Sequence, residues 1–111
     1  MSLMTIAQPD HNQSGDIGWV TYLSDNMEPV IRRDSKVTYI AAKGYSGEGY
    51  YLAVNDAGLA AYLVQKVGKT MHLRSLNEAY PPMEMAPDDF EAVLFGRVTG
   101  VYHQLYRPEA A

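Results

Sequence analysis

Residues 24–29, with the sequence SDNMEP, divide two parts of the chain that differ in character. The residues before them, 19–23 (WVTYL), are an apolar and aromatic run of the kind that favours a strand. Asp25 and Asn26 can hydrogen-bond to their own backbone, and Pro29 disfavours a helical conformation at the residue before it. We therefore expect a turn here, which ends one strand, reverses the chain and begins a new segment.

The rest of the chain repeats this alternation of short β-type runs and turn signals. Residues 55–58 (NDAG) are expected to form a hairpin turn. Residues 59–67 begin with good helix formers, but their place between two turn signals favours a strand. The expected strands are residues 18–23, 37–42, 50–54, 59–67, 71–75 and 90–105.

A proline-rich stretch precedes the longest β-type run. Three prolines within residues 77–89 predict an extended connection without regular structure. In residues 90–105, strict alternation would place Phe95 and Val101 on one face of the strand and Val98 on the other. Two glycines in this run permit a bulge. With about seven short strands in all, the sequence predicts an all-β protein.

The length of 111 residues suits one domain with its own core. We expect a flexible tail or linker at residues 1–16, a single domain at residues 17–107 and a short tail at residues 108–111. The chain has no cysteine, which excludes disulfides and thiolate metal sites. The three histidines are scattered without the spacing of metal ligands. No metal or other cofactor is therefore expected.

Charge and hydropathy limit which partners and which cellular compartment are expected. The formal net charge is −4 and Lys and Arg form no dense cluster, so the chain is a poor binder of nucleic acid by itself. No run approaches the ~20 apolar residues of a membrane span. The first residues lack the charged and apolar regions of a signal peptide. A cytoplasmic protein without a membrane partner is expected.

Four stretches in order resemble the C-terminal domain of the LexA and phage-repressor family of self-cleaving serine peptidases. The family patterns are Gly-Asp-Ser-Met-x-Pro, then a strand with Val-Lys-Arg, then Ser-x-Asn followed by Tyr-Pro, and finally a Gly-Arg-Val strand. The matching stretches are residues 24–29 (SDNMEP), 64–67 (VQKV), 75–81 (SLNEAYP) and 96–102 (GRVTGVY). The resemblance spans roughly residues 18–105. It implies a fold of the LexA and signal-peptidase type with about seven short, twisted strands.

The resemblance places Asn26 where the family has its nucleophilic serine. Gln65 matches the position of the general-base lysine, with Lys66 as an alternative one residue away. An amide offers no nucleophile comparable to a hydroxyl and accepts no proton usefully near neutral pH. The chain is therefore predicted to be no enzyme, with Asn26 and Gln65 as a vestigial dyad. We expect the two amides to approach each other in one groove, within reach of a hydrogen bond or one bridging water.

Two other interpretations remain open. A displaced dyad of Ser24 and Lys66 would make the chain an active self-cleaving serine peptidase. Against it, Lys66 should point to the opposite face of its strand from Gln65. In the third interpretation, a β-domain binds a peptide or small molecule in the groove near Asn26 and Gln65.

The resemblance implies the dimerisation and regulatory domain of a phage or prophage transcriptional repressor. DNA would be bound only through an upstream helix-turn-helix domain, and an antirepressor protein is a further expected partner. A homodimer or higher homo-oligomer is expected to form through the C-terminal strand, predicted to be an exposed edge strand. The predicted interface residues are Val98, Val101, Tyr102, His103, Gln104 and Tyr106.

Overall fold

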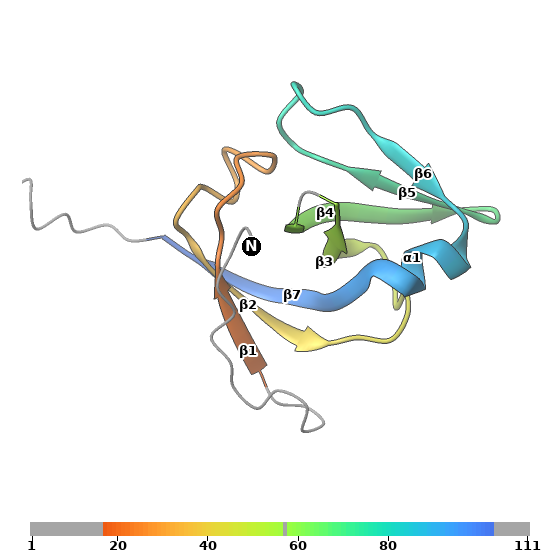
Figure 1. The fold of residues 1–111 in the computed structure, drawn as a ribbon, viewed down its shortest axis with the longest axis horizontal. Helices are drawn as coiled ribbons and strands as arrows, with labels where there is room; N and C mark the ends of the chain where they lie inside the picture. The colour runs from red at the N-terminus through yellow and green to blue at the C-terminus, as the bar shows by residue number, and fades with distance from the viewer. Residues whose placement is uncertain (1–16, 57, 104–111) are drawn as a thin grey trace, which may run out of the picture.

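A computed structural model describes residues 17–56 and 58–103 of the chain (Figure 1). Seven strands form one antiparallel sheet with the order β1-β2-β7-β3-β4-β5-β6, so the predicted all-β class with about seven strands is confirmed. The elements are β1 (Ile17–Thr21), β2 (Lys36–Ala41), β3 (Gly49–Asn55), β4 (Gly58–Val67), β5 (Thr70–Arg74), β6 (Met83–Met85), α1 (Pro87–Val93) and β7 (Leu94–Tyr102).

The predicted hairpin between β3 and β4 is confirmed. Its register runs from Gly49 opposite Val64 to Asn55 opposite Gly58, where the chain turns. The φ angle of Gly58 is 117°, in a region that only glycine adopts readily. Residues 58–67 form the longest strand, because the turns at both ends and the pairing with β3 and β5 outweigh the local helical propensity.

The expectation of an extended connection followed by a strand from residue 90 is wrong. Residues 83–85 add the edge strand β6, and α1 occupies residues 87–93 before β7 begins at Leu94. Pro87 stands in the first turn of α1, and Asp88 and Asp89 follow it. Proline at the first helical position and acidic residues in the first turn are helix-start signals, and here they prevail over the β-type residues that follow.

β7 lies in the middle of the sheet and bends it. β2 pairs with β7 along residues 96–102, whereas β3 pairs only with its first part, at Leu94, Gly96 and Arg97. The register shifts once in each pairing, and the extra residues are Thr99 and Phe95. Figure 1 shows β7 running between β2 on one side and the β3–β6 part of the sheet on the other.

These register shifts correct the predicted faces of the last strand. Phe95, Val98 and Val101 all pack against the same group of buried residues, although strict alternation would put Val98 on the other face. A β-bulge adds one residue to a strand and thereby changes which residues share a face. The sequence permitted a bulge here but did not place it.

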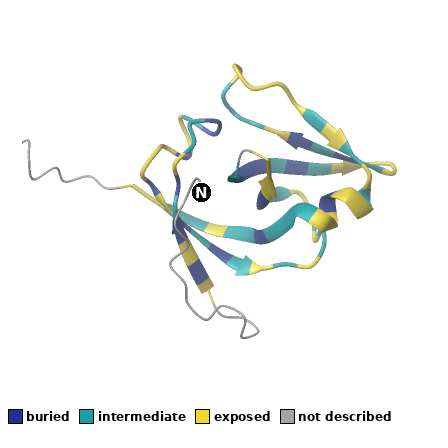
Figure 2. Ribbon diagram, viewed as in Figure 1, coloured by how far each residue is buried: buried dark blue, intermediate teal, exposed yellow. Residues whose placement is uncertain are grey.

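Buried residues form two clusters, visible as dark blue segments in Figure 2. Neighbouring residues of β3, such as Leu52 and Ala53, belong to different clusters, so the clusters lie on opposite faces of the sheet. The first cluster contains Val20, Tyr22, Met27, Ile31, Val37, Tyr39, Leu52, Leu59 and Ala61. The second contains Tyr51, Ala53, Ala60, Tyr62, Val64, Met71, Leu73 and Phe90, the last supplied by α1.

The close packing of β7 against β2 predicts that Gly96 tolerates no side chain. A Cβ atom at this position would lie 2.7 Å from the carbonyl oxygen of Ile40 and 2.8 Å from the ring of Tyr39. Gly96→Ala should therefore lower the free energy of unfolding by about 1–3 kcal/mol, measured by urea denaturation. Gly44→Ala is the matched control, since its nearest neighbour is the flexible carboxylate of Glu91 at 3.4 Å. Equal stabilities of the two variants would contradict this packing.

Candidate functional site

The side chain of Asn26 is buried and fully engaged. Its Nδ2 donates to the carbonyl oxygen of Ala61 at 2.9 Å and to Oγ of Ser75 at 3.1 Å. Its Oδ1 accepts a short hydrogen bond from the hydroxyl of Tyr22. Asn26 is 2% exposed, so these protein groups take the place of water around the amide.

The same hydrogen bonds complete the ladder of β4 where β5 has ended. β5 pairs with β4 from Val67 back to Leu63, and Ala61 lies beyond that pairing. The N–H of Ala61 donates to the Tyr22 hydroxyl at 2.8 Å, and its carbonyl oxygen accepts from Asn26. Tyr22 and Asn26 together thus act as a side-chain substitute for a neighbouring strand, which satisfies two buried backbone groups.

Tyr22 stays protonated in this environment. Burial raises the pKa of its phenol, and the hydrogen bonds from Ala61 and with Asn26 offset only part of that rise. The neutral hydroxyl accepts from Ala61 and donates its proton to Asn26, and both interactions need the proton in place. The site is therefore a neutral hydrogen-bond network, held by residues of three separate segments.

The segment after β5 packs onto the turn that holds Asn26. The backbone N–H of Asn77 donates to the carbonyl oxygen of Asn26 at 2.9 Å, and its Nδ2 donates to that of Asp25 at 3.0 Å. Tyr80 donates its hydroxyl proton to Oδ1 of Asp25, and this bond is the largest cause of the raised pKa of Tyr80. Residues 24–29 and 75–81 are thus brought side by side.

The structure does not bring Gln65 to Asn26. Gln65 lies four residues beyond Ala61 on β4, about 13 Å at the rise of a strand, and pairs with His72 of β5. Within residues 17–56 and 58–103, Asn26 makes no hydrogen bond to Gln65. The residue of β4 that faces Asn26 is Ala61, so the expected contact between two amides is replaced by a contact between an amide and the backbone.

The displaced dyad is not assembled either. Ser24 lies beside Asn26, where its Oγ accepts the Asn26 backbone N–H at 3.2 Å. Lys66 is exposed near the far end of β4, and its backbone N–H donates to the Tyr45 hydroxyl at 3.3 Å. Lys66 lies five residues beyond Ala61, the residue of β4 that Asn26 contacts, which is about 17 Å at the rise of a strand.

Arg97, in the matching stretch 96–102, holds a loop and takes no part in the hydrogen bonds of Asn26. Its guanidinium donates to the carbonyl oxygens of Ser46 and Glu48 at 3.0 and 3.1 Å, and to the Tyr51 hydroxyl at 2.8 Å. It thereby holds the glycine-containing loop between β2 and β3 against β7. Arg97 makes no contact with Asn26 among the described residues.

The predicted interface residues fall into three groups. Val98 and Val101 are partly buried, and their side chains pack against the first cluster. Tyr102 is exposed, and Nδ1 of His103 lies 2.7 Å from Oγ of the buried Ser35. Gln104 and Tyr106 lie outside the described residues. The expectation that this strand forms an edge is wrong for its first part, which has strands on both sides.

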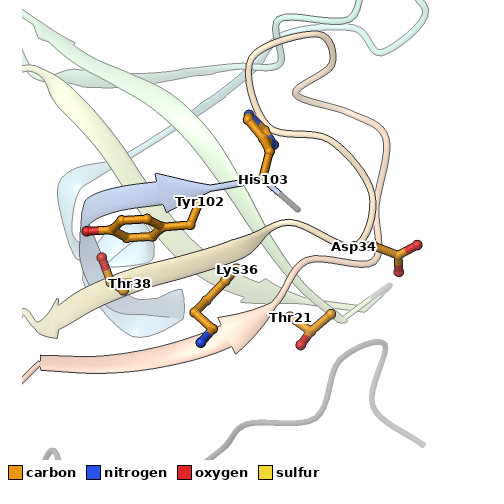
Figure 3. Close-up of a pocket in the computed structure, with 6 residues that line it drawn as sticks. All are labelled: Thr21, Asp34, Lys36, Thr38, Tyr102 and His103. Atoms are coloured by element: carbon orange, nitrogen blue, oxygen red, sulfur yellow. The ribbon is translucent and has the colours of Figure 1, made fainter. Parts of the chain in front are cut away.

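An open pocket of about 520 Å³ lies on the outer side of β1, β2 and β7 (Figure 3). Figure 3 shows Lys36 and Thr38 projecting from β2 on the same side as Tyr102 of β7. Neither Asn26 nor Gln65 lines this pocket, and the amide of Asn26 is covered by protein groups. The lining residues are Thr21, Asp34, Lys36, Thr38, Tyr102 and His103.

Metal-binding and membrane-spanning features were sought in the described part of the chain. There, no group of three or more His, Asp or Glu residues is arranged to hold a metal ion. No helix in residues 17–56 and 58–103 has the length and apolar character needed to cross a membrane.

Sequence reasoning found Asn26 but missed the residues that hold it. Tyr22 looked like one more residue of a β-type run, and Ala61 offers only its backbone. The Ser-x-Asn pattern singled out Ser75 but gave it no partner. Comparison with models of known protein families and with curated proteins finds no match for this chain.

The network predicts a large cost for removing one hydroxyl. Tyr22→Phe leaves the N–H of Ala61 and Oδ1 of Asn26 without their partner inside the protein. Each of these two buried unsatisfied groups costs about 1–3 kcal/mol, so a loss of about 2–6 kcal/mol in the free energy of unfolding is expected by urea denaturation. Tyr80→Phe is the control, because its hydrogen bond to Asp25 is exposed. A Tyr22→Phe variant as stable as Tyr80→Phe would contradict this account.

Proposed function

We propose that this chain is the dimerisation and regulatory domain of a phage or prophage transcriptional repressor. In this proposal it is a catalytically inactive relative of the self-cleaving LexA-type peptidases. It acts in the cytoplasm as a homodimer, and an upstream helix-turn-helix domain makes the DNA contacts. An antirepressor protein is the expected regulatory partner.

The observation that carries the proposal is the meeting of three of the four matching stretches around one core. Met27, Leu76 and Val98, from three of these stretches, all pack in or against the first cluster. The remaining stretch, residues 64–67, lies farther along β4, and its Val64 belongs to the second cluster on the opposite face of the sheet. Residues 24–29 and 75–81 are also joined by hydrogen bonds, from Asn26 to Ser75 and from Asn77 to Asp25.

Loss of catalysis is supported by the chemistry of that site. The residue at the nucleophile position is an amide, and both of its N–H groups are donated to protein acceptors. No lysine side chain of the described residues is hydrogen-bonded to it. Asn26 is hydrogen-bonded instead to Tyr22. The raised pKa of Tyr22 keeps its phenol protonated near neutral pH, and a protonated phenol is a poor base. The hydrogen bonds of Asn26 therefore have a structural role, since they connect the turn to β4 and to the segment after β5.

A peptidase-like domain without catalysis is useful to a repressor through self-association. Two DNA-binding heads joined by a dimer reach paired half-sites together, so binding of the first head raises the effective concentration of the second. The formal charge of −4 fits this division of labour, since the chain itself repels the phosphate backbone.

Fusion to a monomeric helix-turn-helix head tests the proposed role. A head that represses a reporter only when dimerised should repress when joined to residues 1–111, with at least about tenfold gain over the head alone. The matched control is the same fusion with Gly44→Ala, which should keep repression because a methyl group at this position meets only the flexible carboxylate of Glu91. Repression no stronger than that of the head alone would overturn the proposal.

Incubation of the fusion protein at mildly alkaline pH tests the loss of catalysis. We expect it to remain intact at about pH 9, below the usual tyrosine pKa near 10, so that the Tyr22 network stays protonated. Asn26→Ser alone should also remain intact, because the general base is still missing. Mass spectrometry of the products detects any cleavage. Cleavage of the parent, blocked by Ser24→Ala and Lys66→Ala, would favour the displaced dyad instead.

A further inference from the structure

We propose that two copies of this chain pair through β1, edge to edge and antiparallel, around a two-fold axis at Trp19. The two sheets would then join into one continuous sheet. This inference rests on the proposed dimerisation and names the surface that carries it. It replaces the C-terminal strand as the site of contact.

The two edges of the sheet differ in how they are protected. The β6 edge has three residues, includes Glu84 and is flanked by Pro81, Pro82 and Pro87. Short length, charge and proline are the usual devices that prevent an edge from pairing. β1, at the other edge, has five residues (IGWVT) and contains neither charge nor proline. No described strand pairs with its outer edge.

β1 is held firmly from the inner side. Val20 is fully buried in the first cluster, and all five residues of β1 are in register with β2, from Ile17 opposite Ile40 to Thr21 opposite Lys36. A second chain would therefore meet a strand that is already ordered. Little conformational entropy is lost when such a strand pairs.

At the centre of β1, backbone N–H and C=O groups point away from β2, toward the outer edge of the sheet. The N–H of Tyr22 donates to Ser35 and its carbonyl oxygen accepts from Asp34, so both groups of Tyr22 point toward the β2 side. Backbone direction alternates along an antiparallel strand, so those of Thr21, Trp19 and Ile17 point outward. An antiparallel copy centred on Trp19 would exchange two hydrogen bonds between the Trp19 residues.

The side chains fit this register. Ile17 would face Thr21 of the second copy, and the two Trp19 rings would lie next to each other across the axis. Ile17 is 60% exposed and Trp19 37% exposed, so both have apolar area to bury. The ammonium of Lys36 lies 4.5 Å from the centre of the Trp19 ring, which fixes the ring on the outer face beside the seam.

The contact is small, and this sets its strength. Pairing of one five-residue strand buries less than the roughly 1,000 Å² of a stable interface, so a weak dimer is expected. We expect a dissociation constant of about 10–500 μM for the isolated chain. Two heads on paired DNA half-sites would supply the remaining affinity.

Trp19 is the only tryptophan in the chain and provides a direct probe. Sedimentation should show a monomer–dimer equilibrium, and the fluorescence emission of Trp19 should shift to shorter wavelength over the same range of concentration. A dimer that forms without a change in Trp19 emission would overturn the β1 seam.

Substitutions at the axis test the register. Trp19→Lys places like charges opposite each other and should raise the dissociation constant at least about tenfold. Val67→Lys is the matched control, since Val67 is an exposed strand residue on the far end of β4 and the variant carries the same added charge. Circular dichroism and thermal melting establish that both variants remain folded.

A charge-pair variant tests the same register even if Trp19→Lys does not fold. Ile17→Lys should weaken the dimer, and Ile17→Lys with Thr21→Glu should restore it, because each lysine would face a glutamate of the second copy. High salt should weaken the restored dimer more than the wild-type dimer. If Thr21→Glu gives no recovery, the proposed register is wrong.

The outcomes separate this inference from the proposed function. A dimer lost in Trp19→Lys and kept in Val67→Lys supports the β1 seam. A dimer that Trp19→Lys leaves unchanged overturns the seam, while dimerisation and the repressor role stand. A wild type that is monomeric up to about 1 mM overturns both the seam and the dimerisation on which the proposed function depends.

Discussion

The hydrogen bonds of Ala61 to Tyr22 and Asn26 are the contacts on which the rest of the site depends. β4 is longer than β5, and its unpaired part would otherwise leave backbone groups buried without partners. Two side chains from the turn after β1 supply those partners and so fasten β1 to the middle of the sheet. An asparagine suits this position because one amide can donate and accept at once. A serine would have to meet the same demands with one hydroxyl.

Much of the fold could be predicted because its signals are local. The β3–β4 hairpin follows from a turn sequence between two β-type runs, and the strand at residues 58–67 from the turn signals that bound it. The position of β7 could not be predicted, since strand order depends on pairing between distant segments. The bulges at Phe95 and Thr99 depend on the same pairing, and they decide which side chains enter the core.

The candidate site, like the fold, could be predicted from the sequence only in part. Asn26 was found because a turn sequence and a family pattern coincide there. Gln65 was chosen because it matches the lysine of the family's Val-Lys-Arg strand, and a shift of four residues keeps the same face while moving the side chain by about 13 Å. Alternation therefore could not reveal the error. The partner that the structure supplies, the backbone of Ala61, leaves no trace in residue type.

The central place of β7 has a consequence for the order of folding. β7 is the last strand of the sheet in chain order, yet it lies between β2 and β3. During synthesis the β1–β2 pair and the β3–β6 ribbon can form early, because their contacts are local. They cannot join until β7 has emerged and filled the gap. Until then both flanking strands expose uncapped edges to other nascent chains, so the period of greatest aggregation risk ends only when β7 is made.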